Sequence, residues 1–355
     1  MRYLGGGHSC KRLCEKISKL LFQTTGVNYA ESYGKSHYRL RFSFALSSLR
    51  RQYHLFYIFS MNNSRRFLFA AASLLVFTAF LLFPEHAFSQ ANTTSKGHLV
   101  IIGGGPRPEV VMKKIIALAG GSKANIVVIP MASGEPRETA LAQMEQFRKF
   151  GAPAADFLLC TKETADLDSN IAKIRAATGI FFSGGDQTRL TAALQGTKLL
   201  DEIRGVYKRG GVLSGTSAGA AVQSKIMLTG DETVNKDTNN PYGVVQKGNI
   251  ATAEGFGFLD NAIIDQHFVK RKRQNRLLTL ILEHPTLLGI GIDEATCIVV
   301  KPDNTCEVLG DATVQVFDAR AAKRVQTDAN GNLSAQNIRM DIVPSGGTFA
   351  LPKRK

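Results

Sequence analysis

The sequence of 355 residues lacks the common signatures of metal and nucleotide binding. None of its five cysteines stands in a C-x-x-C pair and none of its seven histidines in an H-x-x-x-H pair, so no zinc site is indicated. Three glycines at 103–105 follow an apolar run, but without the G-x-G-x-x-G spacing of a dinucleotide-binding turn. We therefore expect no metal ion and no cofactor. A tight strand-to-helix turn explains these glycines better than a phosphate cradle.

A disulfide framework is also missing. Beyond the first 89 residues three cysteines remain, an odd number for a disulfide framework. Cys297 and Cys306 flank a turn at 302–304, but a symmetric hairpin there pairs Cys306 with about Val300 and leaves Cys297 too far along the strand. We therefore expect these two thiols, and that of Cys160, to be free and buried.

Residues 61–89 have the pattern of a secretory signal peptide. Two arginines precede an apolar run at 67–83, and Ala87 and Ser89 then supply the small residues of a cleavage site. An uncleaved membrane anchor is the alternative, since the run is nearly long enough to span a bilayer. We favour cleavage because the site follows the run directly. The mature protein is then exported, to the periplasm or beyond the cell, and meets the membrane only transiently.

A signal is recognised at the amino terminus, so we interpret residues 1–60 as an over-extended gene start with Met61 as the initiator. Residues 90–96 form a polar lead-in, and 97–355 a single domain. The first 89 residues carry 12 of the 44 Lys and Arg but 3 of the 29 Asp and Glu. Without them the net charge falls from +15 to about +6. The composition therefore gives little support to nucleic-acid binding, and we expect none.

From residue 97 apolar strand patterns alternate with helix patterns. The run at 98–105 is followed at 108–121 by a helix pattern that begins with Pro and closes with Gly. The alternation continues to "VLSGTSAGAAVQS" at 212–224. This predicts an α/β fold of three layers, in which helices cover both faces of a mostly parallel sheet. From about residue 295 short strands and turns predict antiparallel strands near the C-terminus.

The segment 215–219 contains the pattern G-x-S-x-G between an apolar strand and a small-residue helix. In that context a strained turn exposes a serine as a nucleophile, here Ser217, at the carboxyl end of a strand. The backbone N–H of Ala218 is a candidate oxyanion donor, together with those of Gly185 and Asp186 on the turn in "FFSGGDQ". Plain glycine turns without chemistry are the alternative at both places.

A serine nucleophile needs a base, and His267 follows another apolar strand, so we expect it at the same sheet edge as Ser217. The alternative is a histidine that only satisfies a strand end. Asp293 and Glu294 follow a further strand and could orient the imidazole. The pattern alone leaves the choice between these two carboxylates open. The order serine, histidine, acid is not that of the α/β-hydrolases.

Several motifs together carry a resemblance over residues 97–315: "SGGDQ" (183–187), "GTSAGA" (215–220), "GFGFL" followed by "DQHF" (265–268), and "GIDE" (291–294). The chain resembles the cyanophycinases, serine peptidases related to aspartyl dipeptidase E. Each motif is weak alone, but the combination is specific.

The resemblance implies a class I glutamine-amidotransferase-like (flavodoxin-like) fold, a homodimer, and a triad of Ser217, His267 and Glu294, with Glu294 preferred over Asp293. It implies hydrolysis, through an acyl-enzyme, of cyanophycin, a poly-aspartate with arginine amide-linked to its side chains, into β-Asp-Arg dipeptides. Six residues align with positions that shape the substrate site in that family: Gln187, Asp265, Gln266, Arg271, Arg273 and Arg276.

Five cations follow His267 within nine residues, and we expect a basic helix there. Cyanophycin presents free carboxylates beside guanidiniums, and arginine suits two-pronged carboxylate binding. We expect Asp186 and Asp265 to receive guanidinium, and Lys270 and Lys272 to face solvent.

Two other functions compete with this one. An aspartyl or isoaspartyl dipeptidase would share the fold and triad without needing the cations, and a non-catalytic protein could bind an exported polymer. The polar loop at 230–243 and the tail beyond about residue 315 have no assigned role.

Overall fold

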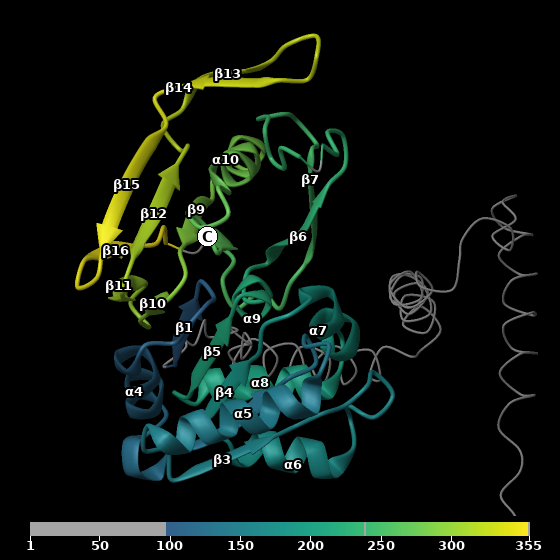
Figure 1. Ribbon diagram of the computed structural model, residues 1–355, viewed down its shortest axis with the longest axis vertical. Coiled ribbons are helices and arrows are strands. Elements are labelled where there is room, and N and C mark those ends of the chain that lie inside the picture. The colour runs from purple at the N-terminus through teal and green to yellow at the C-terminus, as the bar shows by residue number, and fades with distance from the viewer. Residues whose placement is uncertain (1–96, 238, 354–355) are drawn as a thin grey trace, which may run out of the picture. The chain divides into compact units, whose positions relative to one another are not determined.

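The computed structural model describes residues 97–237 and 239–353 (Figure 1). The predicted gene-start segment, signal peptide and lead-in lie outside these residues. Within them, no helix combines the length and the apolar character needed to cross a bilayer.

An eight-stranded sheet forms the centre of the domain. Its strands, in spatial order, are β16 (Thr348–Ala350), β11 (Thr305–Gly310), β10 (Thr296–Val300), β1 (His98–Ile102), β5 (Val212–Thr216), β4 (Gly179–Phe182), β2 (Asn125–Ile129) and β3 (Ala154–Phe157). The strands from β1 to β3 in this order are parallel, while β10, β11 and β16 pair antiparallel. The predicted mostly parallel sheet is confirmed.

Helices cover both faces of this sheet (Figure 1). They are α4 (Glu109–Leu118), the 3-10 helix η1 (Gly121–Lys123), α5 (Pro136–Lys149), α6 (Asp168–Ala176), α7 (Gln187–Leu194), α8 (Lys198–Lys208) and α9 (Ala218–Ala221). Successive strand residues point to opposite faces. Val100 and Ile102 of β1 therefore pack with α4 and α5, and Leu99 and Ile101 with α6 to α9. Two apolar cores result, one on each side.

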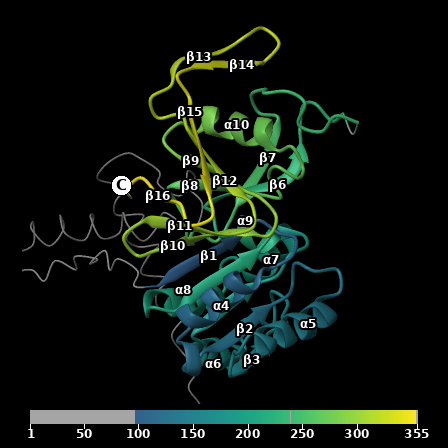
Figure 2. The ribbon, with the colours of Figure 1, turned by 60° about the vertical axis from the view of Figure 1, so that its left-hand side comes forward.

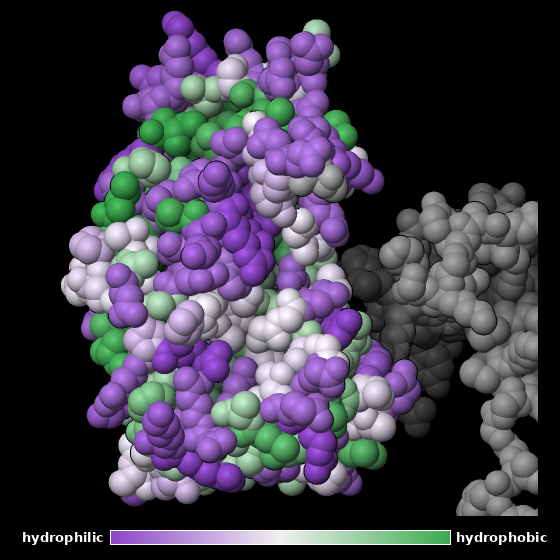
Figure 3. Space-filling view, in the orientation of Figure 1, coloured by the Kyte–Doolittle hydropathy of each residue, from purple (hydrophilic) through white to green (hydrophobic). Residues whose placement is uncertain are grey.

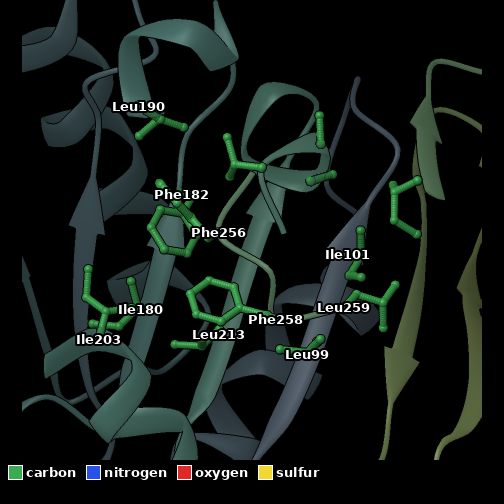
Figure 4. Close-up of a cluster of buried hydrophobic side chains, with 14 of the residues drawn as sticks. Leu99, Ile101, Ile180, Phe182, Leu190, Ile203, Leu213, Phe256, Phe258 and Leu259 are labelled. Carbon is green, nitrogen blue, oxygen red and sulfur yellow. The ribbon is translucent and has the colours of Figure 1, made fainter. Parts of the chain in front are cut away.

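An aromatic group fixes the segment that leads toward the site (Figure 4). The ring of Phe182, on β4, lies 5.4 Å from that of Phe256 and 6.3 Å from that of Phe258. Such pairs contribute roughly 0.5–1.5 kcal/mol beyond the burial of their area. The "GFGFL" segment is thereby held on the face of the central sheet.

A second sheet of four strands follows in the chain: β15 (Arg339–Pro344), β12 (Thr313–Asp318), β9 (Leu288–Ile292) and β8 (Ala262–Gln266). Ile264 and Ile290 pack it onto the β10–β11 half of the central sheet, and α10 (Gln274–Glu283) covers its other face. The expectation that β8 shares the sheet of Ser217 is therefore wrong. A strand buried on both faces has the same apolar pattern in either sheet.

Two hairpins complete the described chain: β6 (Ile226–Glu232) with β7 (Ile250–Glu254), and β13 (Lys323–Thr327) with β14 (Leu333–Gln336). The turned view shows β13 and β14 beyond α10, at the end of the domain away from α5 and α6 (Figure 2). The tail beyond residue 315 closes both sheets, since β15 pairs with β12 and β16 with β11.

The three cysteines are free and buried, as predicted. The hairpin pairs Cys306 with Val300, which leaves Cys297 opposite Leu309. Burial raises the pKa of the Cys297 and Cys306 thiols to about 12, so both stay protonated near neutral pH.

Candidate active site

The turn after β5 holds Ser217 in a strained conformation, with φ 54° and ψ −111°. A side chain at Gly215 would overlap the backbone of Gly219, and one at Gly219 would overlap the carbonyl of Phe182. Small residues on both sides therefore let the chain turn this sharply. Ala220 and Ala221 donate their N–H groups to the Ser217 carbonyl, which starts α9 directly behind the serine.

The side chains of Ser217, His267 and Glu294 form one hydrogen-bonded chain. The Ser217 Oγ lies 2.8 Å from the His267 Nε2, and the His267 Nδ1 lies 2.7 Å from the Glu294 Oε1. Asp293 instead accepts the backbone N–H of Lys270 at 3.0 Å. Of the two carboxylates that the pattern left open, Glu294 is the one placed against the imidazole.

Three successive carbonyl groups at the end of β1 bind the backbone of all three segments. Ile102 accepts the N–H of the serine at 3.1 Å, and Gly103 accepts the N–H of His267 at 2.7 Å. Gly104 accepts the N–H of Ala295, which follows the carboxylate, at 2.9 Å. The glycine loop is thus a support for the site, as the tight-turn interpretation allows, and its glycines bring it close. A side chain at Gly104, where φ is +109°, would overlap the imidazole ring.

This contact generates a test of the loop. Gly104→Ala should lower kcat by about a hundred-fold or more, because a displacement of the base by about 1 Å costs on that order. Steady-state kinetics and circular dichroism measure the two effects. Gly121→Ala is the matched control, since Gly121 also has positive φ but no atom within 4 Å of an added Cβ. Equal activity of the two variants would show that the loop does not position the imidazole.

The charges of the site favour a neutral imidazole beside an ionised acid. Burial lowers the pKa of His267, and the cations of Arg271 and Arg273 lower it further, against the opposing hydrogen bond to Glu294. The hydrogen bond to His267 lowers the pKa of Glu294 in turn. Near neutral pH the imidazole can therefore accept a proton from the serine.

The pH profile should show this state. Protonated His267 cannot act as a base, so kcat/KM should fall as pH falls through its pKa, with the midpoint below the ordinary 6.5. Arg271→Gln removes a cation that opposes protonation, so it should move the acid limb to higher pH. The position of the limb, not its height, is the measured quantity. An acid limb at or above pH 6.5 in the unaltered enzyme would contradict the assignment.

Two backbone N–H groups beside Ser217 are available as oxyanion donors. Neither Gly185 nor Ala218 donates its N–H to an acceptor among the described residues. The N–H of Asp186 is bonded to the carbonyl of Ala132 at 2.8 Å, so the expectation that it joins the oxyanion hole is wrong. This bond ties the turn at Gly185 and Asp186 to the loop that contains Ala132.

A pocket of about 350 Å³ opens beside the serine. Arg271 and Arg273 line it from the segment between β8 and α10, Arg276 from α10, and residues 229–231 from β6. Strongly hydrophilic side chains gather on the middle of this face of the domain, over the region of β9 and β6 (Figure 3). The pocket therefore suits a charged substrate.

The basic segment is not a helix where the sequence predicted one. A turn occupies residues 268–272, and α10 begins only at Gln274. His267 and Lys272 both have positive φ, which interrupts any helix before that point. Arg271 is exposed on this turn, as expected for a residue that meets substrate. Lys270 and Lys272 are also exposed, as predicted.

Arg276 and Asp265 form a buried ion pair, with side chains 1% and 0% exposed. The Nε of Arg276 donates to Asp265 at 2.7 Å, its Nη2 makes a second bond to the same carboxylate, and its Nη1 donates to the Tyr242 hydroxyl at 3.0 Å. Asp265 does not line the pocket, so the expectation that it receives the substrate's guanidinium is wrong. Arg276, which was expected to bind substrate, neutralises the Asp265 carboxylate.

Breaking this pair should destabilise the fold. Arg276→Met leaves the Asp265 charge buried, which costs about 3–5 kcal/mol of unfolding free energy, measured by urea denaturation. Adding Asp265→Asn removes the buried charge, which Arg273 at 3.8 Å neutralises only in part, and should recover part of the loss. Lys270→Met, on the exposed turn, is the control and should change stability little. A single Arg276→Met variant as stable as this control would show that the pair is not structural.

Arg273 and Gln266 are bonded to each other. The Nη1 of Arg273 donates to the backbone carbonyl of Gln266 at 2.6 Å and also to its side-chain oxygen. Burial lowers the pKa of Arg273 to about 10, and the neighbouring Arg276 adds to this effect. Its Nε is buried and has no hydrogen-bond partner among the described residues. Arg273 also lines the pocket, which brings its positive charge to the place of a bound group.

Gln187 is buried at the start of α7, and its amide nitrogen donates to the carbonyls of Leu228 and Thr229, at 2.7 and 2.6 Å. The side chain of Gln187 thus holds β6 in place, and Gln187 also lines the pocket. Sequence patterns did not point to two further residues, Asp231, which lines the pocket, and Tyr242, because both stand in a polar loop pattern. Their only signal was the presence of that loop between nucleophile and base. No cluster of metal ligands occurs in the described part of the chain.

A serine held in a strained turn, bonded to an imidazole that a carboxylate orients, defines a serine hydrolase. The model of peptidase family S51 matches residues 99–308. The chain therefore belongs to peptidase family S51 and is a serine peptidase.

Named relatives agree with this assignment. A cyanophycinase of Thermosynechococcus vestitus is 36% identical over 264 residues, which cover 72% of this chain and 80% of the relative. A cyanophycinase of Trichormus variabilis is 34% identical over 267 residues, covering 72% and 86%. The crystal structure of a peptidase from an acI-B1 Actinobacterium is similar with a TM-score of 0.54 and 25% identity, covering 72% of this chain and 97% of that one. The resemblance seen in the motifs is confirmed.

Proposed function

We propose that the protein is an exported enzyme that hydrolyses cyanophycin to β-Asp-Arg dipeptides. The observation that carries this proposal is the opening of the Ser217–His267–Glu294 network directly onto a pocket with three arginines. The cyanophycinases among its relatives support the same substrate.

The proposed reaction uses the groups of the site in turn. His267 takes the proton of Ser217 as the Oγ attacks a backbone carbonyl between two aspartates, and Glu294 stabilises the imidazolium. The N–H groups of Gly185 and Ala218 hold the oxyanion. The amide nitrogen leaves with the proton from the imidazole, which leaves an acyl-enzyme. Water, deprotonated by His267, then releases the second product and restores the serine.

The substrate explains the arginines at the pocket. Each arginine of cyanophycin is attached through its α-amino group, so its α-carboxylate is free. Arg271, on the exposed turn, and Arg273, which lines the pocket, are the arginines suited to that carboxylate. Arg276 faces the same pocket, but two of its nitrogens are bonded to Asp265.

An aspartyl dipeptidase is the second candidate. It has one supporting observation, a "Peptidase E" of Nostoc sp. that is 25% identical over 151 residues, covering 42% of this chain and 60% of that protein. A dipeptidase of that kind has no use for donors to repeated carboxylates. The arginines therefore favour the polymer.

An assay separates the two. The enzyme should release β-Asp-Arg from cyanophycin, detected by mass spectrometry, and should act at least ten-fold more slowly on α-Asp and β-Asp dipeptides. Ser217→Ala should fold normally and lose nearly all activity, because the acyl-enzyme cannot form. Efficient hydrolysis of the dipeptides with an intact polymer would reject the proposed substrate. Activity of Ser217→Ala above a few per cent would reject the nucleophile.

Export is proposed from the signal pattern at 61–89 alone. Expression from Met61 in a bacterium should place a shortened product outside the cytoplasm, with an N-terminus near Gln90. N-terminal sequencing of the fractionated protein measures this. An unprocessed product in the cytoplasm would refute it.

A further inference from the structure

The carboxylates near the pocket differ in how far they are already bonded. Asp265 is buried in its ion pair. Asp186 caps α7, because it accepts the N–H of Thr188 at 2.8 Å, and its carboxylate also binds the Thr188 hydroxyl at 2.6 Å. Asp231 is exposed in the pocket, and the one hydrogen bond of its side chain to another described residue is accepted from the hydroxyl of Thr229 at 3.3 Å. No cation of the described chain lies within ion-pair distance of Asp231.

The strand that carries Asp231 is fixed on both sides of it. Before it, Gln187 binds the two carbonyls of residues 228 and 229, and the Tyr242 hydroxyl donates to the carbonyl of Gly230 at 2.6 Å. After it, Glu232 accepts the N–H of Tyr242 at 2.9 Å and the amide of Asn249 at 2.8 Å. Asp231 thus stands between bonded neighbours, while its own carboxylate has only a weak partner.

A bulge sets the place of this carboxylate. The register of β6 against β7 shifts between Leu228 and Glu232, and Gly230 has φ +108° with no atom within 4 Å of an added Cβ. Bulges re-aim side chains next to functional sites. Here the bulge comes immediately before the carboxylate that lines the pocket of Ser217. The same pocket therefore has arginines from one segment and a free acid from another.

We propose that Asp231 binds the guanidinium of the substrate arginine whose α-carboxylate lies against Arg271 and Arg273. This proposal rests on the proposed function and extends it. One arginine residue carries both charges, separated by a short aliphatic chain, and meets an opposite charge at each end. The assignment of the guanidinium contact moves from Asp186 and Asp265, which are bonded within the protein, to Asp231. Neutral or acidic side chains at that position of the polymer are thereby disfavoured.

Two synthetic oligomers test the contact. One is a short poly-aspartate carrying arginine, the other carries citrulline, a neutral isostere of arginine. The unaltered enzyme should prefer the arginine oligomer by about three- to thirty-fold in kcat/KM, since a charge-assisted bond to a partly solvated carboxylate is worth that much. Asp231→Asn should lower kcat/KM for the arginine oligomer and bring the ratio of the two substrates close to one. A purely structural role would lower both rates and keep the ratio.

Two matched variants serve as controls. Asp186→Asn changes a carboxylate that lines the same pocket but already caps helix α7. Asp201→Asn changes an exposed carboxylate on α8. Both should keep the preference for arginine. If Asp186→Asn, and not Asp231→Asn, abolished the preference, the proposal would be overturned.

Binding to the Ser217→Ala protein separates this proposal from the proposed function. Calorimetric titration with the two oligomers measures the preference without hydrolysis. Hydrolysis of cyanophycin with no effect of Asp231→Asn on either ratio refutes the guanidinium site and leaves the function standing. A preference that depends on Asp231 in binding, without hydrolysis by the unaltered enzyme, refutes the function and supports the site. Absence of binding by both oligomers refutes both.

Discussion

The carbonyl groups of Ile102, Gly103 and Gly104 are the constraint on which the site depends. They leave the end of β1 in succession and bind, in turn, the segments that carry the serine, the imidazole and the carboxylate. These segments come from two different sheets, so no single strand pairing aligns them. Backbone hydrogen bonds are short and directional, and here they replace a shared sheet as the means of alignment. Glycine at 104 follows from this arrangement, because the imidazole occupies the space of a side chain.

Some charged groups around the pocket form ion pairs that stabilise its surroundings, and others have no ion-pair partner among the described residues. Asp265 and Arg276 neutralise each other in the interior, where an unpaired charge is costly. Their pair also reaches the surface loop, since Arg276 lies over the ring of Tyr242 with its guanidinium carbon 4.8 Å from the ring centre. Tyr242 then bonds to β6. The polar loop is therefore bonded to the interior. The groups proposed to bind substrate, Arg271, Arg273 and Asp231, line the pocket next to these bonded residues.

Much of the fold was predictable from the sequence, because buried parallel strands and amphipathic helices leave strong periodic patterns. The G-x-S-x-G turn and the histidine after a strand were visible for the same reason, as were the three buried thiols. The second sheet was not, since Ile264 and Ile290 would be equally apolar in either sheet. The partner of Asp265 was not predictable either, because an arginine eleven residues along the chain looks the same whether it faces substrate or a buried carboxylate. Which N–H groups stay free, as at Gly185 but not at Asp186, depends on a bond to Ala132 from a distant loop.

The bond between Gly103 and Thr296 has a consequence for the newly made chain. It joins residues nearly two hundred positions apart, and the carboxylate of the site stands only two residues before Thr296. When Ser217 has already left the ribosome, Glu294 and the strand β10 that follows it have therefore not yet been synthesised. Domains fold as units as they emerge, so the nucleophile remains without its aligned partners until almost the whole domain has been translated. A fragment that ends before Glu294 therefore lacks the carboxylate that orients the imidazole.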